Sequence, residues 1–101
     1  PYREDDPTGP VSAYGRSKLA GEILVRERCP RHLILRTSWV VSATGHNFLK
    51  TMLRLGKDRE ELRIVDDQHG RPTPAGLLAD AAIDLAAAAR AGEGWGTYHV
   101  A

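Results

Sequence analysis

Cysteine is nearly missing from this sequence, and its scarcity limits both the available cross-links and the compartment. The 101 residues include a single cysteine, Cys29, so no disulfide can form within the chain. A lone thiol is typical of a reducing compartment, and we expect a cytoplasmic protein. The four histidines lack the spacing of metal ligands, so no metal site is predicted from His32, His46, His69 and His99.

Long apolar runs and an excess of one charge are also missing. No apolar segment approaches the length of a membrane span, and no signal-peptide pattern opens the chain, so we expect no membrane partner. Fourteen basic and thirteen acidic residues give a net charge of +1, and the two signs are interspersed. This balance argues against an electrostatic surface for nucleic acid, and we expect no nucleic-acid partner.

The phosphate-binding turn of a dinucleotide site is absent as well. No Gly-x-Gly-x-x-Gly or Gly-x-x-Gly-x-x-Gly occurs in the chain, and the glycines near its end follow a predicted helix, as helix-ending and loop residues do. A chain of this length can bury a single small core, but it cannot hold a full dinucleotide-binding domain with a substrate lobe. Because it also begins without Met, in a polar loop, we interpret it as a partial chain.

Hydrophobic periodicity predicts alternating helices and strands after an acidic, turn-rich entry loop over residues 1–10. Three helices are predicted, over 12–28, 47–55 and 74–90; Gly56 would end the second, and Thr73 would cap the third with Pro74 in its first position. Short apolar runs predict strands over 32–36, 62–65 and 97–100. Such alternation is typical of parallel strands joined by crossover helices, so the expected fold class is α/β.

Tyr14 and Lys18 are the strongest candidates for chemistry. They lie four residues apart on a predicted helix, so their side chains project from one face, one turn apart. A free phenol has a pKa of about 10, and a neighbouring ammonium lowers the pKa of a phenol because it stabilises the phenolate. The pair therefore suits general acid–base work on a carbonyl or an alcohol. Taken alone, the same spacing also describes an ordinary, partly exposed helix face.

The residues around this pair favour the chemical interpretation. The stretch from Tyr14 to Glu22 reads Tyr-Gly-x-Ser-Lys-x-x-Gly-Glu and resembles the active-site helix of the extended short-chain dehydrogenase/reductases. Further blocks, in the same order, resemble the dTDP-4-dehydrorhamnose reductase family of that superfamily; they cover residues 1–6, 36–40 with 45–53, 66–73 and 96–99. The chain departs from the family pattern at Val41-Ser42, where Tyr-Gly is usual.

The resemblance implies a larger architecture and an activity. Residues 1–101 would form the central to C-terminal part of a reductase domain, with a Rossmann-type, doubly wound parallel sheet and elements of a smaller substrate lobe. The implied reaction reduces the 4-keto group of dTDP-4-dehydro-6-deoxy-L-mannose to dTDP-L-rhamnose with NADPH or NADH. The nucleotide sugar would be the partner, and a homodimer is compatible with the resemblance.

The resemblance also implies roles for individual residues. Tyr14 would donate a proton to the C4 oxygen, and Lys18 would hydrogen-bond the nicotinamide ribose while supporting the phenolate, so both would be catalytic and both would contact the cofactor. Trp39 would pack on the sugar, where an indole face fits a pyranose; a core aromatic at a strand end is the alternative. Asn47, Gln68 and Arg71 would contact the nucleotide sugar, with Arg71 meeting the diphosphate or simply lying exposed in its loop.

Two other interpretations stay open for the whole chain. A sugar epimerase or dehydratase of the same superfamily would use the same Tyr14 and Lys18 with a different substrate lobe. A non-catalytic regulatory relative would have no need of that pair. Asp66 and Asp67 could serve as an acid–base pair or a cation site, although a solvated turn explains them more simply.

Overall fold

The computed structural model describes residues 2–101, and Pro1, the first residue of the predicted entry loop, lies outside the described part. Its elements follow one another as α1 (Ala13–Arg28), β1 (Leu33–Arg36), β2 (Val40–Val41), α2 (Phe48–Asp58), β3 (Thr73–Pro74), α3 (Ala75–Arg90) and β4 (Gly96–His99). No helix in this part of the chain is long and apolar enough to span a bilayer.

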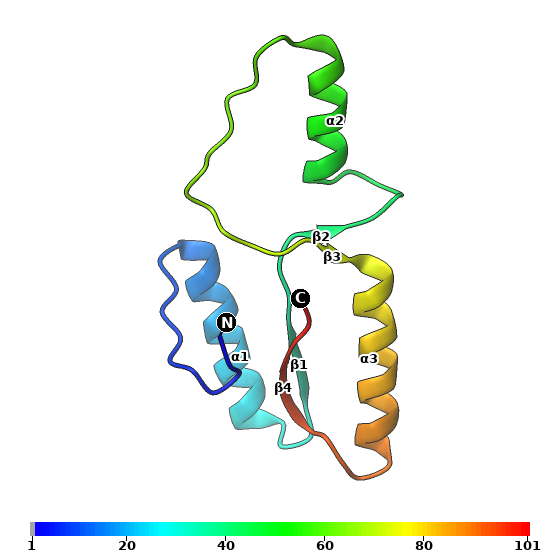
Figure 1. The fold of residues 1–101 in the computed structure, drawn as a ribbon. Coiled ribbons are helices and arrows are strands. Elements are labelled where there is room, and N and C mark those ends of the chain that lie inside the picture. Colours follow the sequence, from blue (N-terminus) through cyan, green and yellow to red (C-terminus); the bar gives the residue numbers. More distant parts are fainter. Residues whose placement is uncertain (1) are drawn as a thin grey trace.

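Two strands far apart in the sequence form the centre of the fold. β1 pairs with β4 in parallel, and the register places Leu33 opposite Gly96 and Arg36 opposite His99. In Figure 1 these strands run between α1 and α3. Because the strands are parallel, Arg36 and His99 meet at the same carboxyl edge, the edge at which ligands bind in open α/β sheets. The predicted α/β class with parallel strands is confirmed.

Helix α1 begins and ends where its sequence places suitable groups. The Ser12 hydroxyl accepts a hydrogen bond from the backbone N–H of Gly15 at 3.0 Å, which satisfies one of the unpaired donors of the first turn. At the other end the Cys29 N–H donates to the Val25 carbonyl at 2.8 Å, and Pro30 prevents further helix. This agrees with the predicted helix over 12–28.

A second, smaller sheet joins the two ends of a long segment, residues 42–72, which we call the excursion. β2 pairs in parallel with β3, with Val40 opposite Thr73, and the Thr73 N–H donates to the Trp39 carbonyl at 3.1 Å. Thr73 is fully buried. Between these strands the chain runs out through α2 and back along an irregular segment, which Figure 1 shows standing apart from the β1–β4 pair.

Three predictions of secondary structure between the end of α2 and the start of α3 were wrong. Residues 62–65 form no strand and pair with no other strand within residues 2–101; Ile64 and Val65 are 52% and 66% exposed. Helix α2 passes through Gly56 and reaches Asp58, because the Arg59 N–H still finds the Leu55 carbonyl at 3.0 Å. Thr73 lies in β3, and Pro74 takes the cap position of α3 without a side-chain cap bond.

The expected small core is also absent from the described residues. Their radius of gyration is 16.8 Å, against about 13 Å for a compact chain of 100 residues. Only Ala89 and Thr73 are buried among residues 2–101. Apolar side chains are exposed on all three helices, including Ile23, Leu24 and Val25 on α1, Phe48, Leu49 and Leu53 on α2, and Leu77 and Ile83 on α3. Residues 2–101 therefore position the site through backbone pairing and local polar contacts, without enclosing a core of their own.

The N-cap of α1 generates the first prediction. Ser12→Ala should lower the free energy of unfolding of the full-length protein by about 1 kcal/mol, because the Gly15 N–H loses its acceptor. Ser17→Ala is the matched control: its hydroxyl only donates to the Tyr14 carbonyl within the same helix, and Ala is the better helix former. Denaturant titration of both variants tests the cap; equal stabilities for the two would contradict it.

Candidate functional site

Tyr14 and Lys18 meet on the exposed face of α1, as their spacing predicts. The Lys18 ammonium nitrogen lies 5.4 Å from the centroid of the Tyr14 ring, within the range of a cation–π contact. Tyr14 is 72% exposed, so its hydroxyl is open to a ligand. Both residues lie in the first half of α1, at the end where Ser12 caps the helix.

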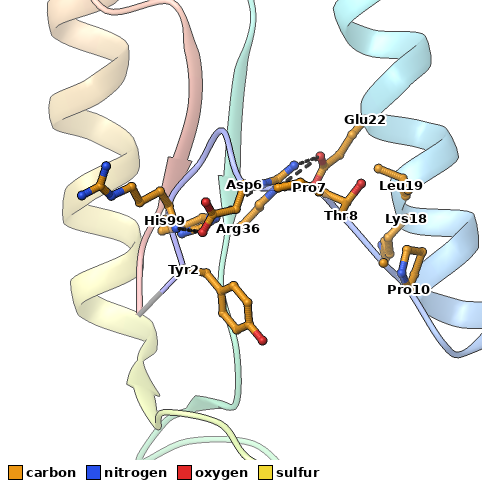
Figure 2. A pocket seen from close by; sticks show the side chains of 13 residues that line it. Tyr2, Asp6, Pro7, Thr8, Pro10, Lys18, Leu19, Glu22, Arg36 and His99 are labelled. Atoms are coloured by element: carbon orange, nitrogen blue, oxygen red, sulfur yellow. Dashed lines mark hydrogen bonds and ion pairs between the residues drawn. The ribbon is translucent and has the colours of Figure 1, made fainter.

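An open pocket of about 580 Å³ lies beside Lys18, and we name it the Lys18 pocket. The entry loop forms one wall through Tyr2, Asp6, Pro7 and their neighbours, and α1 forms another through Lys18, Leu19 and Glu22. Figure 2 shows these side chains converging from the loop, the helix and the carboxyl ends of β1 and β4. Within residues 2–101 the Lys18 ammonium has no hydrogen-bonding acceptor, which leaves its donors available to a ligand.

An ion pair spans this pocket and joins α1 to the sheet. The Arg36 guanidinium donates from Nε to both Glu22 carboxylate oxygens, at 3.0 and 3.2 Å, and from Nη2 to Oε2 at 2.7 Å; Figure 2 marks these contacts. Hydrogen bonding from Arg36 holds the pKa of Glu22 below its ordinary value, although partial burial opposes this. The same bonds raise the pKa of Arg36. Glu22 is therefore ionised and committed to Arg36 near neutral pH.

The entry loop is fastened to the same strand ends. The His99 N–H donates to the Glu4 carboxylate at 2.9 Å, and Arg36 Nη1 donates to the Glu4 carbonyl at 3.3 Å. The hydrogen bond from the His99 backbone lowers the pKa of the Glu4 carboxyl. Arg36 Nη1 also lies 3.4 Å from His99 Nε2. Sequence reasoning missed this polar cluster; the only signals were that Glu22 follows Lys18 by four residues and that Arg36 ends an apolar strand.

Trp39 lies three residues beyond Arg36 and has an unusual backbone. Its φ is +43°, the only positive φ of a non-glycine residue within residues 2–101. A bulky residue in the left-handed region carries strain, which structures maintain chiefly at functional sites. The indole is 46% exposed, and its ring centroid lies 6.2 Å from that of Phe48, in a tilted arrangement. The indole is therefore not buried within residues 2–101, and whether it contacts the sugar or a core stays a prediction.

A second pocket, of about 510 Å³, opens beside the indole, and we name it the Trp39 pocket. Its lining is largely apolar and includes Phe48, Ile64, Val65 and Pro72, with Gln68 as a polar member. The structure thus brings together Trp39 and Gln68, two of the predicted substrate contacts. The Trp39 pocket and the Lys18 pocket share no lining residue.

Asn47 and Arg71 take positions that also serve the backbone. The Asn47 amide caps α2 by accepting from the Lys50 N–H at 3.0 Å and donates to the Ser42 carbonyl at 2.7 Å. One amide hydrogen and one lone pair remain unused within the described part. The Ser38 hydroxyl donates to the Arg71 carbonyl at 3.1 Å and accepts from the Arg71 N–H at 3.3 Å. Arg71 as a whole is exposed.

Nothing in the described part of the chain assembles three or more His, Cys, Asp or Glu side chains as a metal ion would require. Asp66 and Asp67 lie in an exposed bend of the irregular segment.

Known proteins resemble this chain along its whole length. It is 52% identical over 101 residues to dTDP-4-dehydrorhamnose reductase from Shigella flexneri and 50% identical over 101 residues to that from Salmonella typhimurium, covering 99% of this chain in each case. The chain spans only 34% of the length of each relative, so it corresponds to about a third of these proteins.

Solved structures agree with this placement. A dTDP-4-dehydrorhamnose reductase from Clostridium acetobutylicum superposes with a TM-score of 0.86 at 40% identity, covering 98% of this chain and 34% of that one. The reductase from Bacillus anthracis, solved in complex with NADP, gives a TM-score of 0.84 at 43% identity, covering 97% and 34%. The model of the RmlD substrate binding domain matches residues 1–101. By this match over its entire length, the chain belongs to the RmlD substrate binding domain family.

Proposed function

We propose that the chain is part of an enzyme that reduces the 4-keto group of dTDP-4-dehydro-6-deoxy-L-mannose to dTDP-L-rhamnose with NADPH or NADH. The observation that carries the proposal is the Lys18 ammonium 5.4 Å from the ring centroid of an exposed Tyr14. A cation there favours the phenolate that remains after proton donation. The relatives named dTDP-4-dehydrorhamnose reductase support the substrate and the reaction.

The arrangement of elements supports assigning them to two parts of a larger domain, a central sheet and a smaller substrate lobe. We infer that β1 and β4, flanked by α1 and α3, belong to a Rossmann-type, doubly wound parallel sheet, of which residues 1–101 are a central to C-terminal part. The excursion between β2 and β3, which carries α2, would belong to the smaller substrate lobe. Parallel pairing in both strand pairs supports this assignment.

The NADP bound in the Bacillus anthracis relative suggests which cofactor this site takes. The residues present fit one part of it: the Lys18 ammonium has donors that meet no acceptor within residues 2–101, and a ribose hydroxyl would satisfy them. The diphosphate of the dinucleotide would be held outside this chain, since residues 1–101 contain no glycine-rich turn. When bound, the dinucleotide supplies the hydride that reduces C4.

The proton is the part of the reaction that this chain supplies. As C4 becomes tetrahedral, its oxygen gains negative charge, and the Tyr14 hydroxyl donates the proton that converts it to an alcohol. The phenolate left behind is stabilised by Lys18 until solvent restores the proton. A general acid placed in this way typically contributes about 10²- to 10⁴-fold to the rate.

The Trp39 pocket supplies a surface for a deoxysugar. The indole face and the apolar lining would pack against the pyranose ring and its methyl group. Gln68 would hydrogen-bond a hydroxyl, and Asn47 would add its remaining amide hydrogen. Arg71, exposed in the neighbouring loop, is the guanidinium available for the diphosphate.

The same Tyr14 and Lys18 would also serve an epimerase or a dehydratase. The meeting of Trp39 and Gln68 at one pocket favours the reductase, because both residues belong to the blocks that resemble it. Product analysis separates the alternatives: a reductase consumes one NAD(P)H for each sugar, whereas epimerisation and dehydration leave the cofactor with no net change. A regulatory relative would show no turnover.

The general acid generates a prediction for the full-length enzyme. Tyr14→Phe should lower kcat by about 10²-fold or more, because the variant keeps the ring but loses the proton. Substrate affinity should change little. Tyr98→Phe is the matched control, since its hydroxyl donates to the Gly94 carbonyl at 2.6 Å and lines neither the Lys18 nor the Trp39 pocket; its kcat should stay near that of the wild type. A Tyr14→Phe enzyme with near-normal kcat would refute the assignment.

Trp39 generates a second prediction. Trp39→Ala should weaken binding of the nucleotide sugar and leave the affinity for the free dinucleotide nearly intact, because the indole is exposed beside an apolar pocket. Trp39→Phe should keep much of the packing but lose the indole N–H. Calorimetric titration of both ligands, with melting temperatures, measures these effects. A core role would instead cost about 3–5 kcal/mol of stability, with every function lost in proportion.

The contact between Trp39 and Gly70 generates a third. A Cβ placed on Gly70 would lie 2.6 Å from the indole Nε1 and 2.7 Å from Cε2, so Gly70→Ala must displace the ring or the loop. Overpacking of this kind typically costs about 1–3 kcal/mol, and we expect weaker nucleotide-sugar binding with it. In the control, Gly76→Ala, the new methyl meets nothing within 4 Å. If both variants bind the nucleotide sugar as the wild type does, the loop does not position the indole.

A further inference from the structure

Lys18 lies between two groups that compete for its charge. Tyr14 precedes it by four residues on α1 and Glu22 follows it by four, so both are its neighbours on one helix face. A lysine and a glutamate at this spacing can form an ion pair, although the order with Glu first is the more favourable one, and such a pair would draw the ammonium away from the phenol. In the structure the ammonium lies near the Tyr14 ring, and no ion pair joins Lys18 to Glu22 within residues 2–101.

Arg36 explains why Glu22 does not take Lys18. Its planar fork occupies both carboxylate oxygens through three contacts between 2.7 and 3.2 Å, and a bidentate guanidinium is the strongest partner a carboxylate finds among side chains. The guanidinium is itself held by the Glu4 carbonyl. Arg36 and Glu22 are only 20% and 17% exposed, so water screens the pair less than it screens a surface pair.

Arg26 cannot replace this interaction. It approaches Glu22 with a single contact of 3.5 Å from a side chain that is 39% exposed, and exposed pairs of this kind contribute little. The remaining charged or titratable groups around the pocket come from every adjoining element: Tyr2, Arg3, Glu4 and Asp6 from the entry loop, Lys18 from α1, and His99 from β4. Of these, only the backbone of Glu4 and the ring of His99 lie within hydrogen-bonding reach of Arg36.

We propose that Arg36 is a positioning residue: by holding the Glu22 carboxylate it keeps the Lys18 ammonium directed at Tyr14. The inference rests on the proposed function of that pair and extends it to a residue on a different element. Without Arg36, the Glu22 carboxylate is free, one helical turn from Lys18, and forms an ion pair with the Lys18 ammonium. The phenolate then loses its stabilising cation, although every group that touches the substrate is still present.

This mechanism predicts an interaction between substitutions that a structural role does not. In the full-length enzyme, Arg36→Gln should move the pH–kcat profile in the alkaline direction, because the phenolate loses its neighbouring cation. Glu22→Gln should leave the profile in place, because it removes the competitor. The double variant Arg36→Gln/Glu22→Gln should return the profile to within a few tenths of a unit of the wild type. Lys18→Ala gives the largest alkaline shift and calibrates the scale.

Three controls make the result specific. Arg26→Gln removes a guanidinium beside the same carboxylate and should shift nothing; a through-space charge effect would shift it as well and would move Glu22→Gln in the acid direction. Ultraviolet titration of phenolate, taken as the difference between each variant and its Tyr14→Phe counterpart, reports the same shift without turnover. Should Arg36→Gln not fold, Arg36→Lys serves instead, with a smaller shift in the same direction that Glu22→Gln also reverses.

The outcomes separate this inference from the proposed function. If Tyr14→Phe is inactive and Arg36→Gln leaves the profile unshifted, the proposed function stands and the positioning role is refuted. A double variant that is no better than Arg36→Gln alone overturns it too, since a purely structural ion pair gives that result. If Tyr14→Phe retains its kcat, the proposed function itself fails.

Discussion

The bidentate contact between Arg36 and Glu22 is the interaction on which the rest of this structure depends. Few apolar contacts hold α1 against the strands, and none of its residues is buried. The guanidinium therefore fixes where the helix stands relative to the carboxyl ends of β1 and β4. The entry loop joins the same centre through Glu4 and His99. The elements that line the Lys18 pocket thus meet through polar contacts whose geometry is more directional than apolar packing.

This dependence on polar contacts is consistent with the large exposed area of the described residues. Apolar faces on α1, α2 and α3 are open, and the chain covers about a third of the length of its relatives. The faces that a longer protein would cover are those that carry the hydrophobic contribution to stability. The groups that we propose for the chemistry, by contrast, already have local partners within these residues. Local geometry of the site and global stability of the fold are thus supplied by different surfaces.

The parts of the fold that the sequence could predict are those governed by local rules. The limits of α1 follow from Ser12 at one end and Pro30 at the other, and the Tyr14–Lys18 contact follows from helical spacing. The failures are non-local. Residues 62–65 have strand composition but no partner, and Thr73 is taken by a two-residue pairing with Val40 that no periodicity could indicate. The link between Glu22 and Arg36 joins residues 14 positions apart, so it requires the register of helix against sheet. The left-handed backbone of Trp39 could not be predicted either, since nothing about a tryptophan favours it.

The pairing of β2 with β3 has a consequence for how the chain is divided. The pairing of Val40 with the buried Thr73 brings the two ends of a long excursion together, so residues 42–72 leave the small sheet and return to it at the same place. The pairing of β1 with β4 involves none of these residues, and neither does the contact between Tyr14 and Lys18. The segment that carries Gln68, Asn47 and α2 therefore meets the rest of the described chain at a different place from the one that holds Tyr14 and Lys18.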